Sequence, residues 1–208
     1  MNALPQPCLG FESSRLVDVT EEAPEFAVKR YPLVNLKAGK VVIDGKEIAF
    51  KETALMNGKL RMILPEDFRP IPTVQRYYQS GPVPDLLLTD ASGVIQLAMT
   101  HLNQKVSNDT EVTAYQYETQ QLLKRTNPSI EWLLGGVKDI SGRQIGFYEF
   151  IIPLAGTGHY QLSFFLELEQ RILSGNFVCT DRKLRSWKTL FYQMLGSLRV
   201  ITSQDWID

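Results

Sequence analysis

The 208-residue chain is short of the side chains from which most catalytic and metal-binding sites are built. It has two cysteines, Cys8 and Cys179, and two histidines, His101 and His159. Two cysteines are too few for the disulfide framework of a small secreted protein. Two histidines, without carboxylates clustered at a useful spacing, do not predict a metal site. We therefore expect no disulfide, no metal and no cofactor.

Long apolar runs are also missing. No stretch approaches 18 apolar residues, so the sequence predicts no transmembrane helix. The first residues, MNALPQPCLGFESSRL, have neither a positively charged beginning nor a long apolar segment, and they are not typical of a secretory signal. These features predict a cytoplasmic protein without membrane insertion.

The chain has no excess of charge of either sign. It has 22 basic and 23 acidic residues, a formal net charge of -1, and 44% hydrophobic residues. The hydrophobic fraction is that of an ordinary globular protein, and a nucleic-acid-binding domain would need a basic excess. The common nucleotide, zinc and hydrolase motifs do not occur either. We expect a non-enzymatic protein that binds no nucleic acid.

The sequence predicts an N-terminal arm followed by one α+β domain. Residues 1–30 are rich in proline and acidic side chains, whereas the pattern from residue 31 to 208 is that of a folded domain. Asp44-Gly45 lies between two β-prone runs and indicates a hairpin within 31–52. Downstream, two segments of the form D-x-S-G, at 90–93 and 139–142, provide further turns.

Two helices are expected among these strands. Asn108 with Glu111 resembles a capping box and begins a helix that runs to about Arg125. The last helix begins at Thr180 or Asp181 and has apolar residues at helical spacing. The sum is an antiparallel sheet of about six to eight strands packed by two main helices, with an N-terminal extension.

Aromatic residues are the best candidates for partner contacts. Phe165 interrupts the polar side of the strand 159–169, and we expect it to form an apolar strip with Trp132 or Phe147 on the sheet face away from the helices. A second candidate patch is the contiguous set Arg76, Tyr77 and Tyr78, because tyrosine and arginine often anchor interfaces. In both cases the alternative is that these side chains pack within the protein, beneath a loop, the arm or a second copy.

Cys179 allows a different hypothesis. A thiol at a helix N-terminus can have a lowered pKa and act as a nucleophile, with either histidine as its base. The alternative is that it behaves as a small buried hydrophobic side chain, as free cysteines commonly do. The first interpretation predicts a small enzyme and the second does not.

The segments GRQIGFYEFIIP and HYQLSFFLELEQRILSGNFVCTDRKLRSWKTLFYQMLGSLRVI resemble the C-terminal half of the PsbP/DcrB-like superfamily. The pattern is a pair of long strands, a strand with small and aromatic residues in alternation, a helix with tryptophan in its first turns, and a serine before a short strand. Its positions here are Gly175, Phe177, Cys179, Trp187, Ser197 and Leu198. Pro65 and Phe68 resemble an earlier step of the family pattern, so the similar core covers 59–201.

This resemblance implies an antiparallel sheet flanked by helices and, in most members, a binding or assembly role without enzyme activity. From it we expect a protein partner or client and an adaptor or chaperone-like function that uses an apolar sheet face. A homodimer and a structural subunit of a larger complex are the alternatives. The superfamily's roles differ so widely that the fold does not choose among them.

Overall fold

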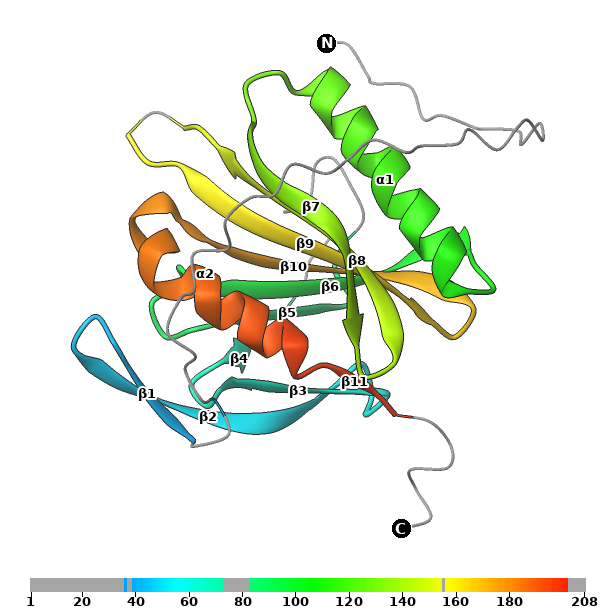
Figure 1. Ribbon diagram of the computed structural model, residues 1–208. Coiled ribbons are helices and arrows are strands. Elements are labelled where there is room, and N and C mark those ends of the chain that lie inside the picture. The colour runs from blue at the N-terminus through cyan, green and yellow to red at the C-terminus, as the bar shows by residue number, and fades with distance from the viewer. Residues whose placement is uncertain (1–35, 37–38, 73–82, 155, 202–208) are drawn as a thin grey trace. The chain divides into compact units, whose positions relative to one another are not determined.

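The computed structural model describes residue 36 and residues 39–72, 83–154 and 156–201, all within the segment 32–208 (Figure 1). The predicted arm, 1–30, lies outside them. The described elements in chain order are β1 (Lys40–Ile43), β2 (Lys46–Leu55), β3 (Leu60–Pro65), β4 (Arg69–Pro70), β5 (Leu86–Thr89), β6 (Gln96–Lys105), α1 (Asp109–Thr126), β7 (Glu131–Ile140), β8 (Arg143–Ile152), β9 (His159–Leu168), β10 (Arg171–Thr180), α2 (Asp181–Gly196) and β11 (Arg199–Val200).

The strands form two antiparallel sheets, and the α+β class is confirmed. The larger sheet has seven strands in the order β4-β5-β6-β10-β9-β8-β7, and the smaller has four in the order β1-β2-β3-β11. The sequence pattern predicted a single meander of similar size to the larger sheet. The second sheet arises because β3 pairs back onto β2 and accepts the short strand β11 on its other edge, where Arg199 lies opposite Arg61.

Two of the predicted turns have the backbone geometry that their residues favour. Asp44 and Gly45 have φ of +49° and +77°, the two positive values that a tight hairpin turn between β1 and β2 needs. Ser141 and Gly142 repeat this geometry between β7 and β8, with φ of +54° and +76°. The first turn fixes the register of β1 against β2, and the second fixes that of β7 against β8.

Helix α1 packs on one face of the larger sheet, over β8 and β9 (Figure 1). Its capping residues are those that the sequence predicted: the Glu111 backbone N–H donates to Asn108 Oδ1 at 3.0 Å, and the Glu111 carboxylate accepts from the Ser107 N–H at 2.7 Å. Close approach of the helix depends on Gly146 of β8, because a Cβ at this position would lie 2.9 Å from the Gln116 Cβ.

Helix α2 covers the opposite face together with the smaller sheet. Five of its side chains are buried in the main hydrophobic core: Trp187, Leu190, Phe191, Met194 and Leu195. The same core contains inward-facing side chains of β3, β6, β9 and β10, so it joins the two sheets. Within the part of the chain that the structure describes, neither helix is long and apolar enough to cross a membrane.

Candidate protein-binding edge

Trp132 and Phe147, the two alternatives that were predicted to form a strip with Phe165, lie on different faces of the sheet. Phe165 is only 3% exposed and packs beneath α1, with its ring centroid 5.8 Å from that of Tyr115. Trp132 lies on the same face, 5.2 Å from Phe150. Phe147 points to the other face, where its ring centroid lies 5.8 Å from that of Tyr192 of α2. Phe165 and Trp132 therefore share one apolar cluster, as one of the two alternatives expected, but α1 covers it, and the expectation that the strip lies on a face away from the helices is wrong.

The reason lies in what covers the face that carries Phe165. The alternation along β9 indicated a polar, solvent-facing side, but α1 covers the part of that side near Phe165. Further along the same face the side chains are polar and bonded to each other: Ser163 Oγ donates to Asn176 Oδ1 at 2.7 Å, and Gln161 Nε2 donates to the same oxygen at 2.8 Å. A role of Phe165, Trp132 or Phe147 in partner binding stays a prediction, and Arg76, Tyr77 and Tyr78 lie outside the described residues.

The outer edge of β7 is the most unusual surface of the larger sheet. Strand β7 is ten residues long, and its only partner among the described strands is β8. Three of its apolar side chains are exposed: Leu133 by 37%, Leu134 by 48% and Val137 by 42%. A long edge with exposed apolar residues invites pairing with another chain, because it presents unpaired N–H and C=O groups.

The opposite edge of the same sheet has the usual protection. Strand β4 is two residues long, Arg69 and Pro70, and pairs with only Thr89 and Leu88 of β5. Shortness, a charged residue and proline are three of the ways in which proteins prevent pairing at an edge. The β7 edge lacks the shortness and the proline, so among the described residues it is the more open edge of the two.

Helix α1 lies close to β7 without covering its outer edge. A Cβ at Gly135 would be 2.7 Å from Gln120 Nε2, so the helix approaches the strand here through a glycine. One turn further on, Lys124 Nζ lies 5.4 Å from the centre of the Trp132 ring. Tyr117, which is exposed, lies one turn before Gln120 on the same side of the helix. An aromatic and a cationic side chain thus flank the strand edge.

The sequence contained a signal for this edge that we interpreted only as a strand. In EWLLGGVKDI, apolar residues are consecutive and do not alternate with polar ones, and a glycine pair stands at the centre. Such a pattern is usual in a strand covered on both faces. In β7 it occurs on a strand with several exposed residues, and this exposure becomes visible only when the strand order is known.

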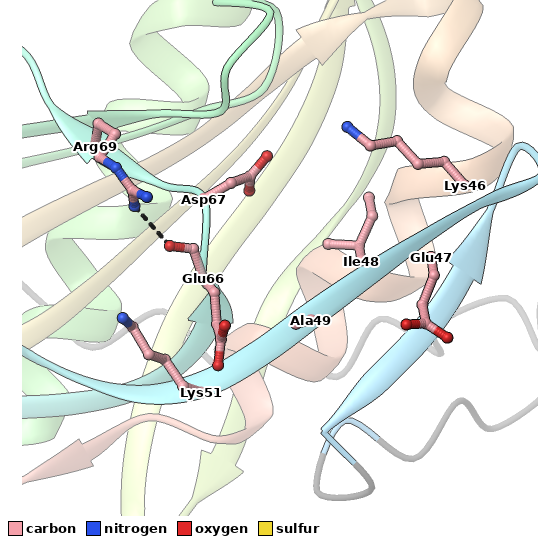
Figure 2. Close-up of a pocket in the computed structure, with 8 residues that line it drawn as sticks. All are labelled: Lys46, Glu47, Ile48, Ala49, Lys51, Glu66, Asp67 and Arg69. Carbon is pink, nitrogen blue, oxygen red and sulfur yellow. Dashed lines mark hydrogen bonds between the residues drawn. The ribbon is translucent and has the colours of Figure 1, made fainter.

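A shallow depression lies on the smaller sheet. Figure 2 shows it between β2 and the turn that follows β3, with a volume of about 410 Å³. Two of its charged side chains have partners: Arg69 donates to the Glu66 carbonyl at 2.6 Å, and Glu47 pairs with Lys40 at 2.7 Å. The lining residues are Lys46, Glu47, Ile48, Ala49, Lys51, Glu66, Asp67 and Arg69. Neither histidine nor cysteine is among these lining residues.

Cys179 has the environment of a structural cysteine. Its side chain is 1% exposed and belongs to the main core, and burial together with the nearby Asp181 carboxylate raises the pKa of the thiol to about 12. Despite its place beside a helix N-terminus, the thiol therefore has a pKa above its ordinary value. His159 lies opposite Thr180, one residue from Cys179, and so points to the other face of the sheet. His101 lies opposite Leu173, about 20 Å along the strand from the thiol.

One buried ion pair lies on the α2 side of β8. Glu149 is 1% exposed and accepts hydrogen bonds from Lys188 Nζ, at 2.6 Å, and from the Tyr160 hydroxyl. Burial and the adjacent Glu149 carboxylate raise the pKa of Tyr160. Because both oxygens of Glu149 have donors, the group is satisfied within the fold. Among the described ranges, no three His, Cys, Asp or Glu side chains are grouped closely enough to hold a metal ion.

The fold is similar to that of known proteins, although no protein-family model matches the sequence and no curated protein matches it as a relative. The cyanobacterial PsbP protein CyanoP from Synechocystis sp. PCC 6803 superposes with a TM-score of 0.55 at 12% identity, covering 82% of this chain and 100% of that protein. The Ran-binding protein Mog1p of Saccharomyces cerevisiae gives 0.47 at 12% identity, over 76% and 98%. LpqN, involved in cell envelope biogenesis of Mycobacterium tuberculosis, gives 0.43 at 10% identity, over 74% and 92%.

The resemblance to the PsbP/DcrB-like superfamily is thus confirmed as a shared fold. At 12% identity the similarity to CyanoP concerns architecture alone, since one fold supports many functions. What this chain does must be argued from its own surface.

Proposed function

We propose that this protein is a non-enzymatic binding or adaptor protein, and that the outer edge of β7 is where it binds another polypeptide. The observation that carries this proposal is the exposed apolar edge of a ten-residue strand, with Leu133, Leu134 and Val137 accessible. No comparably long strand of the larger sheet has an open edge among the described residues.

The binding mode that fits this surface is strand addition. An extended segment of the partner would pair with the main chain of β7, and its alternate side chains would contact the two faces of the edge. Ten residues provide a strand of about 33 Å, enough for several main-chain hydrogen bonds. The apolar side chains would add burial of about 25 cal/mol for each Å² removed from water.

The state of Cys179 supports the non-enzymatic part of the proposal. A nucleophilic thiol needs to be accessible and partly ionised near neutral pH, whereas this one is buried with a raised pKa. We expect Cys179 to resist alkylation at pH 7.5 in the folded protein and to react once the protein is unfolded in urea. Rapid modification of the native thiol would revive the enzyme hypothesis.

The finer parts of the hypothesis are also proposals. A cytoplasmic location is compatible with the absence of a membrane-spanning helix among the described residues. A chaperone-like role would require the edge to bind a segment that is exposed only in an incompletely folded client. Both follow from the sequence pattern and need their own measurement.

The edge can be tested in cells of the native source with a photo-crosslinking amino acid at Leu133. We expect crosslinks to polypeptide from this position. We expect none from Val42, an exposed apolar residue of β1 in the other sheet. The crosslinks should disappear when Leu134 and Val137 are both replaced by lysine, because charged side chains at an edge prevent strand pairing.

A matched control separates pairing from general loss of apolar surface. Leu154 is 51% exposed but lies after the end of β8, so Leu154→Lys removes a similar surface without touching the edge. Crosslinking that survives the change at Leu134 and Val137, or that falls equally with Leu154→Lys, would contradict the proposal.

A further inference from the structure

The charges on β7 are complementary to those of a second, antiparallel copy of the same strand. Glu131 lies opposite Ile151 and Lys138 opposite Ile145 in the pairing with β8. Both isoleucines belong to the main core on the α2 side, so Glu131 and Lys138 also lie on that side of the sheet. An acidic group near one end of the edge and a basic group near the other therefore share a face.

A bulge in β7 makes this arrangement symmetric. The register with β8 shifts between Trp132 and Leu134, so Leu133 is an extra residue in the strand. Without Leu133, seven pairing positions run from Glu131 to Lys138, and Gly135 is the central one. The strand thus has a centre about which an antiparallel copy can be aligned.

We propose that the partner at this edge is a second copy of this chain, paired antiparallel with β7 across a two-fold axis at Gly135; this rests on the proposed function of the edge. Glu131 then lies opposite Lys138 of the second copy, Trp132 opposite Val137, and Leu134 opposite Gly136. Every pair joins residues of the same sheet face, as a continuous sheet requires. A two-fold interface forms each contact twice.

The side chains that this register places opposite each other are complementary in charge and size. The two Glu131–Lys138 pairs are attractive, and cross-strand pairs of opposite charge stabilise a sheet. Trp132 next to Val137 is an aromatic and β-branched pair, a favourable combination. At the centre, glycines meet glycines or Leu134, so no bulky side chains collide. A one-residue change of register would move these side chains to opposite faces.

The helices also leave room for the second copy. Helix α1 lies over β8 and β9, and in the proposed pairing the two β8 strands are three strand spacings apart, about 14 Å. Packed helices approach to about 8–10 Å. Because Gln120 of α1 reaches Gly135, the two copies of this side chain would face each other at the two-fold axis.

Charge exchange tests this register with the full-length purified chain. Glu131→Lys and Lys138→Glu each replace two attractive pairs with two repulsive ones. We expect either variant to dimerise at least about tenfold more weakly than the unchanged protein in sedimentation equilibrium. An equimolar mixture of the two variants should associate again, because in the mixed dimer both cross-strand pairs join a basic side chain to an acidic one. Circular dichroism melts confirm that both variants are folded.

Three results would overturn the inference. The unchanged protein could be monomeric at every concentration at which it is soluble. It could dimerise with the same affinity in both single variants, which would place the interface elsewhere. A photo-crosslinker at Leu133 in the purified chain could react within one molecule, with residues 1–35, and not yield a product of twice the mass.

These outcomes distinguish the inference from the proposed function. A monomeric protein whose Leu133 position still crosslinks to a different polypeptide in cells keeps the edge as a binding site and excludes the second copy. Loss of both the dimer and the cellular crosslink rejects both.

Discussion

The larger sheet is covered by a helix on each face, and the two helices are held very differently. Helix α2 inserts five buried side chains, among them Trp187 and Phe191, into a core that also includes the smaller sheet. Helix α1 buries only Val112 and Gln116 fully, over a small cluster around Phe165. Local stability in proteins follows such differences in buried contacts.

This difference separates a rigid layer from an adaptable one. The α2 side joins both sheets into one cooperative core, whereas α1 rests on β8 and β9 beside the open edge of β7. Binding regions tend to come from the less stable parts of a fold. On one of its two faces, the proposed binding edge is therefore flanked by the less deeply packed helix, where Lys124 lies over Trp132.

Two phenylalanines offer the most direct test of the comparison. Phe191 is fully buried between Phe177, at 5.0 Å, and Trp187, at 5.9 Å, whereas Phe165 is buried under α1. We expect Phe191→Ala to lower the free energy of unfolding by about 5 kcal/mol and Phe165→Ala by about 3 kcal/mol. Urea denaturation measures both. Equal costs, or a larger one for Phe165, would show that the α1 side is no weaker.

The buried ion pair on the α2 side of the sheet, Glu149 with Lys188, should be costly to break. Lys188→Met leaves the Glu149 carboxylate buried with Tyr160 as its remaining donor. We expect a loss of about 3 kcal/mol in the free energy of unfolding, because an unpaired buried charge is strongly destabilising.

An exposed pair provides the control. Lys183→Met breaks the ion pair between Lys183 and Asp44, in which both side chains are more than two-fifths exposed. We expect this change to lower the free energy of unfolding far less than Lys188→Met does. Adding Glu149→Gln to Lys188→Met should recover part of the loss, since the amide oxygen can still accept from Tyr160. If Lys188→Met and Lys183→Met lower the free energy of unfolding equally, Glu149 is not buried as described.

Much of this architecture could be predicted from local sequence. The Asp44-Gly45 turn, the Asn108 cap and the apolar stripe of the last helix are determined by neighbouring residues, and all three are found in the structure. The shared fold was also indicated by the packing pattern of the closing segments. Structural features that depend on residues close together in the chain could therefore be predicted.

The candidate site could not be predicted in the same way, because it depends on strand order. Nothing local to Leu134 says that β7 is the last strand of its sheet, and nothing local to Phe165 says that α1, some 40 residues earlier, covers it. The raised pKa of Cys179 likewise arises from burial by distant segments, which outweighs the nearby helix N-terminus.

A glycine pair in neighbouring strands tests how α1 is seated. A Cβ at Gly146 would lie 2.9 Å from the Gln116 Cβ and force the helix outward, whereas at Gly136 the nearest atom is at 3.9 Å, an ordinary contact. We expect Gly146→Ala to cost about 2 kcal/mol through overpacking and Gly136→Ala to change stability by less than about 0.5 kcal/mol. Hydrogen exchange should show faster opening of α1 in the first variant alone. Unchanged exchange in both would mean that the helix adapts without cost.

The smallest expected effect is a pH dependence from the α2 side of the sheet. His101 has a buried Nε2 without a hydrogen-bond partner among the described residues. Burial lowers the pKa of this imidazole, the nearby Arg171 and Lys59 act in the same direction, and Asp85 and Glu169 oppose them. The unfolded chain, with an ordinary histidine pKa of about 6.5, therefore binds the proton more readily than the folded protein does.

The sign of the effect follows from this order of pKa values. The contribution of neutral His101 to stability is complete above the unfolded pKa and is lost as the pH falls from there toward the lower folded pKa. The exposed pairs of Asp44 and Glu169, whose pKa values are also lowered, lose their contributions only at more acidic pH. We expect the unfolding free energy of the unchanged protein to fall more between pH 7.5 and 5.5 than that of His101→Gln. Parallel curves for the two proteins would show that His101 is solvated in the fold, and the α2 side would then be less tightly packed at β6 than at β9 and β10.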